Sequence, residues 1–305
     1  MFDDNARLAR ALSFSATAIH YAVDMATDIP PDTASRIARL RDFLDAHRRV
    51  FVLTGAGIST ASGIPDYRDA NGAWKRKPPV TWQAFVDDPA TYRRYWARSF
   101  VGWPIFSAAT PNASHAALAR LGLRGGLGAI VTQNVDGLHQ RAGSRDAIDL
   151  HGRLDRVICL GCGDDMLRAA LQPTLASLNP DWRPKTAGAA PDGDADIDDE
   201  AIARFLPPQC AHCGGMLKPD VVFFGENVPR ARYTQALDAF AQADAVLVAG
   251  SSLMVYSGFR FARMAHERGL PLALLNRGQT RADALATLKL DDDCGTVLDA
   301  AITHD

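Results

Sequence analysis

The chain lacks the long hydrophobic runs that mark membrane proteins. None of its apolar stretches approaches the roughly 20 residues that a membrane-spanning helix needs. The first residues include Asp3 and Asp4 and no hydrophobic segment, which is unlike a secretory signal and too acidic for an organelle-targeting peptide. We therefore expect a cytoplasmic protein that has no membrane partner.

The chain also has little net charge. Its 33 lysines and arginines and 35 acidic residues give a formal net charge of −2. Nucleic-acid binding normally requires a basic face, and the short basic run from Lys75 to Lys77 is typical of a solvated loop. We expect no nucleic-acid partner and a monomeric protein, although no residue pattern bears on the oligomeric state.

Cysteine is scarce, yet four of the five cysteines form two matched pairs. Two residues separate Cys159 from Cys162, and two separate Cys210 from Cys213. Each such turn can present two thiolates to one tetrahedral Zn²⁺. A reducing cytosol disfavours disulfides, and redox pairs rarely occur as two matched units. Because four protein ligands leave no open position for water, we predict one closed, structural zinc site.

Short apolar runs alternate with segments long enough to form helices. Residues 37–44 carry the apolar stripe of a helix, and buried strands are indicated at 50–53, 129–131, 245–249 and 272–275. This alternation is typical of an α/β fold with a Rossmann-like, doubly wound parallel sheet. We predict that fold, with a small inserted zinc-binding module and a helical insertion.

Polar residues or glycines follow each of these strands. They are Thr54 and Gly55, Thr132 to Asn134, Gly250 to Ser252, and Asn276. Ligands of doubly wound sheets bind at the carboxyl ends of the strands, so we predict one shared site there.

The glycine pattern after the first strand differs from that of a dehydrogenase. Gly55-Ala56-Gly57 would let the backbone approach a phosphate, but Thr60 stands where the dinucleotide fingerprint has its third glycine. The acidic residue expected about 20 residues later is also missing, because residues 75–79 read KRKPP. These departures disfavour hydride transfer but still allow a dinucleotide ligand.

Several longer segments, taken in order, resemble the sirtuins, the family of NAD-dependent protein deacylases. They are TGAGISTASGIPDYR at 54–68, TQNVD at 132–136, LHG at 150–152, KPDVVFFGE at 218–226 and GSS at 250–252, with the four cysteines in their expected place. The resemblance runs from about Arg36 to the C-terminus. Segments 94–103, 190–194 and 255–258 are similar to the class II branch, which includes the mitochondrial sirtuin four.

The resemblance implies an N-terminal extension at 1–32 and a catalytic domain at 33–305. In the extension, Leu8, Leu12, Ile19 and Val23 could line a short helix, which we interpret as a surface appendage or a partly disordered tail. The Rossmann-like parts would span about 33–61, 104–153 and 217–305, the helical insertion about 62–103 and the zinc module about 154–216. Residues 191–196 are acidic and turn-rich, which predicts a loop.

The reaction that the resemblance implies consumes NAD and an acyl-lysine protein and yields free lysine, nicotinamide and an O-acyl-ADP-ribose. His151, held after a short strand at 148–150, would be the general base, since an imidazole titrates near neutral pH. Asn134 and Asp136 would share in catalysis, and we interpret His139 as structural. The implied NAD contacts are Gly55, Ala56, Gly57, Asp66, Tyr67, Arg68, Gln133, Asn134, Asp136, Gly250, Ser251, Ser252, Asn276 and Cys294.

The implied substrate contacts are Val221, Val222, Phe223 and Arg98. A strand at 221–224 would pair with the backbone of the protein substrate, although one of its two phenylalanines could belong to the core. Arg98 could meet an acidic acyl chain. Desuccinylases of the family carry a Tyr-x-x-Arg pair, and Tyr95 and Arg98 have this spacing. An ungapped count, however, places Trp96 and Ser99 at the pair positions, so Tyr95 and Arg98 are one residue out of register.

Two other functions use the same fold. A protein ADP-ribosyltransferase would use the same NAD site, and a zinc-bearing module could sense NAD without turnover. Asn134, Asp136 and His151 disfavour the pure sensor, which needs no general base. The residues leave open the preferred acyl group, the protein substrates, the balance between deacylase and transferase activity, and the role of residues 1–32.

Overall fold

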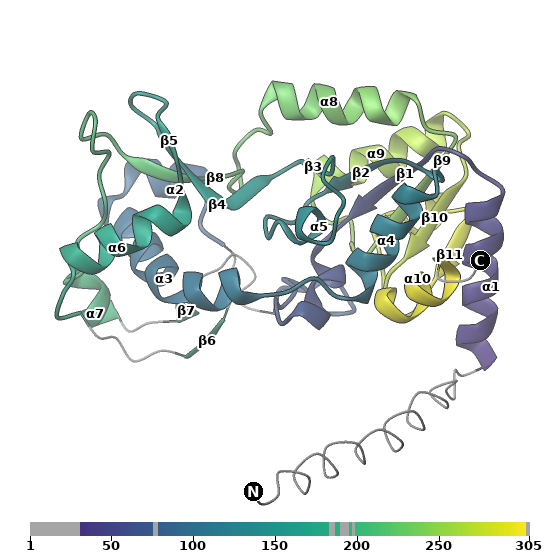
Figure 1. The fold of residues 1–305 in the computed structure, drawn as a ribbon, viewed down its shortest axis with the longest axis horizontal. Coiled ribbons are helices and arrows are strands. Elements are labelled where there is room, and N and C mark those ends of the chain that lie inside the picture. The colour runs from purple at the N-terminus through teal and green to yellow at the C-terminus, as the bar shows by residue number, and fades with distance from the viewer. Residues whose placement is uncertain (1–30, 76–78, 183–186, 190–194, 197–198, 303–305) are drawn as a thin grey trace, which may run out of the picture.

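The computed structural model describes residues 31–75, 79–182, 187–189, 195–196 and 199–302 (Figure 1). Three sequence predictions lie outside these residues: the helix or tail before residue 31, the basic run at 76–77, and the loop at 191–194. Ala195 and Asp196, which the predicted loop included, form a short strand, β7.

A six-stranded parallel sheet forms the larger part of the molecule. Its strands are β1 (Val50–Thr54), β2 (Leu127–Thr132), β3 (Ile148–Asp149), β9 (Ala245–Ala249), β10 (Leu272–Leu275) and β11 (Leu288–Leu290), in the order β11-β10-β9-β1-β2-β3. β1, β9 and β10 are buried along their whole length, as expected for strands that are covered on both faces. The predicted doubly wound sheet is confirmed.

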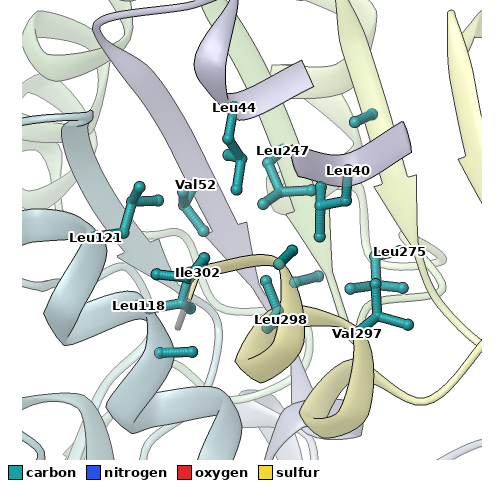
Figure 2. Packing of buried hydrophobic residues seen from close by; sticks show 14 of the residues in the cluster. Leu40, Leu44, Val52, Leu118, Leu121, Leu247, Leu275, Val297, Leu298 and Ile302 are labelled. Carbon is teal, nitrogen blue, oxygen red and sulfur yellow. The ribbon is translucent and has the colours of Figure 1, made fainter. Parts of the chain in front are cut away.

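Three helices cover one face of this sheet: α1 (Pro31–Asp45), α4 (Ala113–Leu123) and α10 (Cys294–Ile302). Leu40 of α1, Leu118 of α4 and Leu298 of α10 are fully buried and belong to one cluster with Val52 of β1 (Figure 2). Burying one such leucine contributes roughly 1.5–3 kcal/mol. The predicted helix at 37–44 is confirmed as the part of α1 that packs here.

Two helices, α8 (Arg230–Ala241) and α9 (Tyr256–Glu267), cover the opposite face. Phe51 of β1 meets Phe240 of α8 and Phe261 of α9, with ring centroids 5.3 and 5.2 Å apart. We call the six-stranded sheet with α1, α4, α5 (Leu138–Arg141), α8, α9 and α10 the sheet half.

The smaller part, which we call the cysteine half, contains a three-stranded antiparallel sheet in the order β5-β4-β8 (Figure 1). Its elements are β4 (Gly152–Cys159), β5 (Asp165–Leu167), β8 (Leu217–Val221), the hairpin of β6 (Ala187–Ala189) and β7 (Ala195–Asp196), and helices α2 (Trp82–Asp87), α3 (Pro89–Ala108), α6 (Arg168–Leu178) and α7 (Asp199–Ala203). Its core is rich in aromatic rings. Phe85 of α2 stacks on Phe223 with ring centroids 4.8 Å apart, and the fully buried Trp96 donates Nε1–H to the carbonyl of Leu217 at 3.3 Å.

The strand predicted at 221–224 is wrong beyond its first residue, because β8 ends at Val221. The Val222 N–H donates to the carbonyl of His151 at 2.8 Å, and the carbonyl of Phe224 accepts from the Trp82 N–H at 2.8 Å. The backbone groups of Val222 and Phe224 thus form hydrogen bonds with segments that are distant in sequence. The segment 222–224 therefore passes from β4 toward α2.

Short helical turns complete the described fold. They are the 3₁₀ turns η1 (Ala56–Ile58), η2 (Thr60–Ser62) and η3 (Asp283–Leu285). Within the described residues, no helix combines the length and the apolarity needed to cross a membrane.

Candidate active site

A cavity of about 700 Å³ lies where the carboxyl edge of the parallel sheet faces the cysteine half. The segments after β1, β2, β9 and β10 line it, as the sequence predicted. Each implied NAD contact is among its lining residues: Gly55, Ala56, Gly57, Asp66, Tyr67, Arg68, Gln133, Asn134, Asp136, Gly250, Ser251, Ser252, Asn276 and Cys294. His151 and Val221 to Phe223 line it too. Arg98 does not belong to this lining.

Glycines allow β1 and β9 to approach each other where the strand order reverses. The Gly57 N–H donates to the Gly250 carbonyl at 2.8 Å. A Cβ atom at Gly57 would stand 2.9 Å from the Gly250 Cα, and one at Gly250, where φ is +63°, would stand 2.4 Å from the Ile58 nitrogen. Only glycine fits at both positions, so the two strand ends can face one ligand.

Ser59 ties Asn134 and Asp136, which follow β2, to the loop after β1. The Asn134 Nδ2 donates to the Gly55 carbonyl and to Ser59 Oγ, both at 3.0 Å. Ser59 Oγ donates to Asp136 Oδ2 at 2.7 Å, and Asp136 Oδ1 accepts the Leu138 N–H at 2.9 Å. The amide and the carboxylate are therefore fixed at the cavity wall, where they can bind hydroxyl and carboxamide groups.

Two hydrogen bonds fix the tautomer of His151. Its Nδ1 lies 3.0 Å from the carbonyl oxygen of Gln133. Because a carbonyl oxygen can only accept, Nδ1 carries the proton and Nε2 carries the lone pair. Ser257 Oγ, which lies 2.8 Å away on α9, then donates to Nε2.

The pKa of His151 is lower than the near-neutral value expected from the sequence. Burial lowers the pKa to about 4, the carbonyl of Gln133 opposes this shift, and the positive charge of Arg232 adds to it. The imidazole is thus neutral at physiological pH and ready to accept a proton, but it is a weaker base than a free histidine.

His139 lies behind the cavity and does not line it. Its Nε2 is 2.9 Å from Thr54 Oγ1 at the end of β1, and its ring centroid is 5.1 Å from that of the buried His115. Burial lowers the pKa of His139 to about 3 and also lowers the pKa of His115. Two neutral imidazoles thus pack beneath the strand end, as the structural interpretation of His139 requires.

The loop after η2 brings Asp66 to Arg68 to the cavity. Asp66 pairs with Lys75, with 2.5 Å between Oδ1 and Nζ. Arg68 donates to a backbone carbonyl of its own loop at 2.7 Å, and its guanidinium carbon lies 3.8 Å from the ring centre of Trp74. Arg68 is thus engaged within the loop, and its contact with phosphate stays a prediction.

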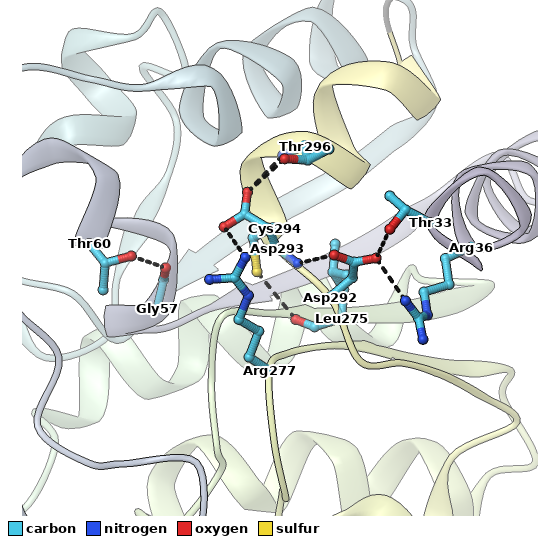
Figure 3. A network of polar contacts seen from close by, with 10 residues as sticks. All are labelled: Thr33, Arg36, Gly57, Thr60, Leu275, Arg277, Asp292, Asp293, Cys294 and Thr296. Atoms are coloured by element: carbon cyan, nitrogen blue, oxygen red, sulfur yellow. Dashed lines mark hydrogen bonds and ion pairs between the residues drawn. The ribbon is translucent and has the colours of Figure 1, made fainter. Parts of the chain in front are cut away.

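A polar network encloses the cavity end formed by β10 and α10 (Figure 3). Cys294 Sγ donates to a backbone carbonyl of β10 at 3.5 Å, and burial raises the pKa of this thiol to about 12, so it stays neutral. Asp292 accepts from Thr33 Oγ1 at 2.7 Å and pairs with Arg36 at 3.0 Å. Figure 3 shows how these two contacts connect α1 to the cavity wall.

The cavity wall toward the cysteine half is largely aromatic. Phe223 lines the cavity and belongs to the core, as the sequence analysis allowed for one of the two phenylalanines. Tyr95 of α3 also lines the cavity, with its ring centroid 5.4 Å from that of Phe223. Arg98 follows Tyr95 by three residues, so the two side chains lie about 60° apart around α3, but Arg98 does not line the cavity. Contact between Arg98 and an acyl group stays a prediction.

The four paired cysteines converge on one point of the cysteine half. The sulfurs of Cys159 and Cys213 are 3.5 Å apart, those of Cys162 and Cys210 are 3.7 Å apart, and all four lie within 4.8 Å of one another. Four Zn–S bonds of about 2.3 Å in a tetrahedron place sulfurs roughly 3.8 Å apart, so these positions fit one zinc ion. None of the four lines the cavity, which suits a structural metal.

Backbone groups around the sulfurs also fit a metal site. The N–H groups of Gly161 and Gly215 donate to Cys159 Sγ at 3.3 Å and to Cys213 Sγ at 3.4 Å. Such bonds stabilise thiolates and orient them. A Cβ atom at Gly215 would stand 3.0 Å from Cys213 Sγ and 3.1 Å from Cys159 Sγ, so a side chain there would crowd the ligands.

The predicted site residues did not include four residues that complete the site: Ser59, Trp74, Tyr95, which was considered only as half of an out-of-register pair, and Ser257. Three of them lie inside segments that carried the family resemblance, which was the available signal. Their partners, such as Asp136 for Ser59 and His151 for Ser257, are distant in sequence. The pairing therefore becomes visible only in the folded chain.

The fold and the cavity together define a Rossmann-like nucleotide-binding protein that carries a four-cysteine metal module and a neutral histidine in its cavity. The Sir2 family model matches residues 55–257, which is most of the chain. The chain belongs to the Sir2 family, whose members are the sirtuins.

Curated relatives and a solved structure agree with this assignment. The NAD-dependent protein deacetylase of Xanthomonas axonopodis pv. citri (strain 306) is 60% identical over 259 residues, which cover 85% of this chain and 88% of the relative. The NAD-dependent protein deacetylase of Bordetella bronchiseptica is 56% identical over 264 residues, with 87% and 96% covered. A Sir2 structure with a p53 peptide and NAD⁺ matches with a TM-score of 0.68 at 30% identity, covering 86% of this chain and 95% of that one.

Proposed function

We propose that this chain is an NAD-dependent protein-lysine deacylase that releases nicotinamide and an O-acyl-ADP-ribose. The strongest support is the neutral His151, whose Nε2 lone pair shares one cavity with Asn134 and Asp136. Family membership supports the same reaction, as do the relatives described as NAD-dependent protein deacetylases.

In this proposal the acyl oxygen of the substrate forms a bond to C1′ of the nicotinamide ribose of NAD, and the bond from that carbon to nicotinamide breaks. Asn134 and Asp136 hold the ribose and the carboxamide, using groups that are already fixed through Ser59. His151 Nε2 accepts the proton of a ribose hydroxyl, and the carbonyl of Gln133 keeps the Nδ1 proton in place as the ring becomes charged. Ser257, which donates to Nε2 here, gives up this position to the ribose.

The remaining cavity walls suit the rest of NAD and the backbone of the acyl-lysine substrate. The strand ends at Gly55–Gly57 and Gly250–Ser252 would receive the diphosphate, and Asn276 and Cys294 the adenosine. The segment Val221–Phe223, whose backbone is anchored to His151, would lie beside the acyl-lysine backbone. The four cysteines would hold the structural zinc.

We further assign the chain to the class II branch, near sirtuin four. Two branch-like segments reach the cavity: 94–103 contributes Tyr95, and 255–258 contributes Val255. The third segment, 190–194, lies outside the described residues. Tyr95 and Phe106 are the α3 residues among those that line the cavity, and we assign the contact with the acyl group to Tyr95, which lies in the first of these segments. Selective loss of acidic-acyl turnover in Arg98→Met would support a contact between Arg98 and the acyl group. In this proposal the catalytic domain begins near residue 33 and works in the cytoplasm as a monomer.

Product analysis tests the proposal. The purified protein is incubated with NAD and acetyl-, lipoyl-, succinyl- or methylglutaryl-lysine peptides, and mass spectrometry follows free lysine peptide and O-acyl-ADP-ribose. We expect equal amounts of the two products with at least one acyl type. Biotinylated NAD runs in parallel. Label on protein without O-acyl-ADP-ribose would indicate the ADP-ribosyltransferase instead, and NAD binding with neither outcome would indicate the sensor.

A further inference from the structure

Three arginines surround one exposed tyrosine at the start of α9. The Tyr256 side chain is 43% exposed. The guanidinium carbons of Arg260, Arg263 and Arg281 lie 5.1, 5.7 and 5.8 Å from the centre of its ring. Two of these arginines come from α9, whereas Arg281 comes from the segment after β10. We call Tyr256, Arg260, Arg263 and Arg281 the arginine patch.

The positive charge of the arginine patch is largely uncompensated. Arg263 pairs with Glu267 at 3.2 Å, and this is the one acidic partner of the three arginines within the described residues. The guanidinium carbon of Arg260 lies 4.5 Å from the ring centre of Tyr233, and that of Arg281 lies 4.3 Å from the ring centre of Phe259. Cation–π contacts therefore position both arginines. Three fixed like charges close together favour an anionic partner, and they stand out in a chain whose net charge is −2.

The arginine patch borders the cavity. Met254 and Val255, the residues before Tyr256, line the cavity, and Ser257, the residue after it, donates to His151. Arg281 also reaches back to this segment, with its guanidinium 3.5 Å from the Met254 carbonyl oxygen. A polypeptide that places a lysine beside His151 therefore has flanking residues within reach of the arginines.

We propose that the arginine patch binds an acidic segment of the substrate protein that flanks the acyl-lysine. Carboxylates match guanidinium groups in charge and in planar geometry, and the exposed tyrosine adds an apolar surface between them. The patch thus selects among substrate sequences, which backbone pairing alone does not. This inference rests on the proposed deacylase function.

Matched peptides test the inference. One acetyl-lysine peptide is made with three Glu, three Gln or three Lys residues on its N-terminal side, and a second series carries them on its C-terminal side. In one series we expect kcat/KM to be about tenfold higher for Glu than for Gln at low salt, and this ratio should fall toward one in 0.5 M NaCl.

Reversing or removing the arginine charges identifies the residues that cause the preference for Glu over Gln peptides. In Arg263→Glu and in Arg260→Gln/Arg281→Gln we expect the Glu-to-Gln ratio to fall at least threefold, and Arg263→Glu should gain turnover of the Lys peptide. Arg39→Glu, an exposed change on α1 across the sheet, is the control and should keep the wild-type ratio. An equal loss on the Glu and Gln peptides, or the same shift in the control, would overturn the inference.

The proposed function and this inference can fail separately. If no peptide is turned over, the deacylase proposal fails, and the anisotropy of the same peptides labelled with a fluorophore still measures binding. Tighter binding of the Glu peptide that is lost in Arg263→Glu would support the arginine patch. Equal binding of the Glu and Gln peptides would overturn it.

Discussion

The sheet half and the cysteine half are stabilised in different ways. In the sheet half, fully buried aliphatic strands lie between two layers of helices, so burial of apolar surface accounts for its stability. The cysteine half has a smaller, aromatic core, short strands, and four cysteines from chain segments about 50 residues apart. It also buries the guanidinium of Arg168, whose Nη2 donates to the Ser99 carbonyl at 3.2 Å, while its Nε and Nη1 have no hydrogen-bond partner among the described residues.

This difference shows why the cysteine half needs a metal and the sheet half does not. A small core that also buries a charged guanidinium gains little net stability from packing. A zinc ion bound by four thiolates supplies the missing free energy. The proposed active site uses both halves, because the sheet half provides the strand ends for NAD and the cysteine half provides Tyr95 and Phe223.

Loss of a zinc ligand should have the largest effect. In Cys210→Ser we expect loss of the metal, unfolding of the cysteine half and loss of deacylase activity, because bound zinc contributes on the order of 10 kcal/mol to folding. All five tryptophans lie between residues 74 and 182, outside the sheet half, so a red-shifted tryptophan emission would report this change. Far-UV circular dichroism should retain the signal of the sheet half. In the control, Cys294→Ser, zinc content should be unchanged; unchanged emission in Cys210→Ser would contradict the comparison.

A void created in the core of the sheet half should destabilise the sheet half and affect the cysteine half much less. Leu298→Ala removes a fully buried side chain, and we expect the sheet half to lose about 2–5 kcal/mol. The circular dichroism transition in urea should move to lower concentration, while the tryptophan transition should move less. Leu123→Ala, at a position 89% exposed, should change neither. Equal shifts of both transitions would show that the halves unfold as one unit.

The contact between the ends of β1 and β9 can be tested at Gly57. In Gly57→Ala the new Cβ would stand 2.9 Å from Gly250, so the strand ends must separate. We expect NAD affinity, measured by calorimetry, to fall at least tenfold, with a loss of stability of about 1–3 kcal/mol. Gly122→Ala on α4 lies away from the cavity and should keep wild-type affinity. Tight NAD binding in Gly57→Ala would refute the role given to this contact.

Lowering the pH should reduce the free energy of unfolding by less than these substitutions do. The pKa values of His151 and His139 are lowered to about 4 and about 3, whereas unfolded histidine titrates near 6.5. The unfolded chain therefore binds more protons, and stability should fall as the pH drops from about 6.5 to 4. Burial raises the pKa of Asp149 to about 6, which acts in the opposite direction and costs stability as the pH rises. Urea unfolding at pH 7.5 and pH 5 would measure the balance; greater stability at pH 5 would contradict the dominance of the histidines.

The sheet could be predicted because its strands are buried on both faces, so that Val50 to Leu53 reads as a continuous apolar run. The segment 222–224 could not, since His151 and Trp82 take its backbone groups. In the same way, the carbonyl of Gln133 sets the tautomer of His151, and burial sets its pKa. Motifs placed the site residues in order along the chain, whereas contacts between distant segments set their chemistry.

Nicotinamide release by wild-type protein and His151→Ala tests the central claim most directly, namely that the cavity between the two halves is a deacylase site with His151 as its base. With NAD and a reactive acyl-lysine peptide, we predict one nicotinamide for each lysine freed by the wild type. His151→Ala should bind NAD normally and free lysine roughly 10²–10⁴ times more slowly. Lysine release in His151→Ala at the wild-type rate would contradict the account.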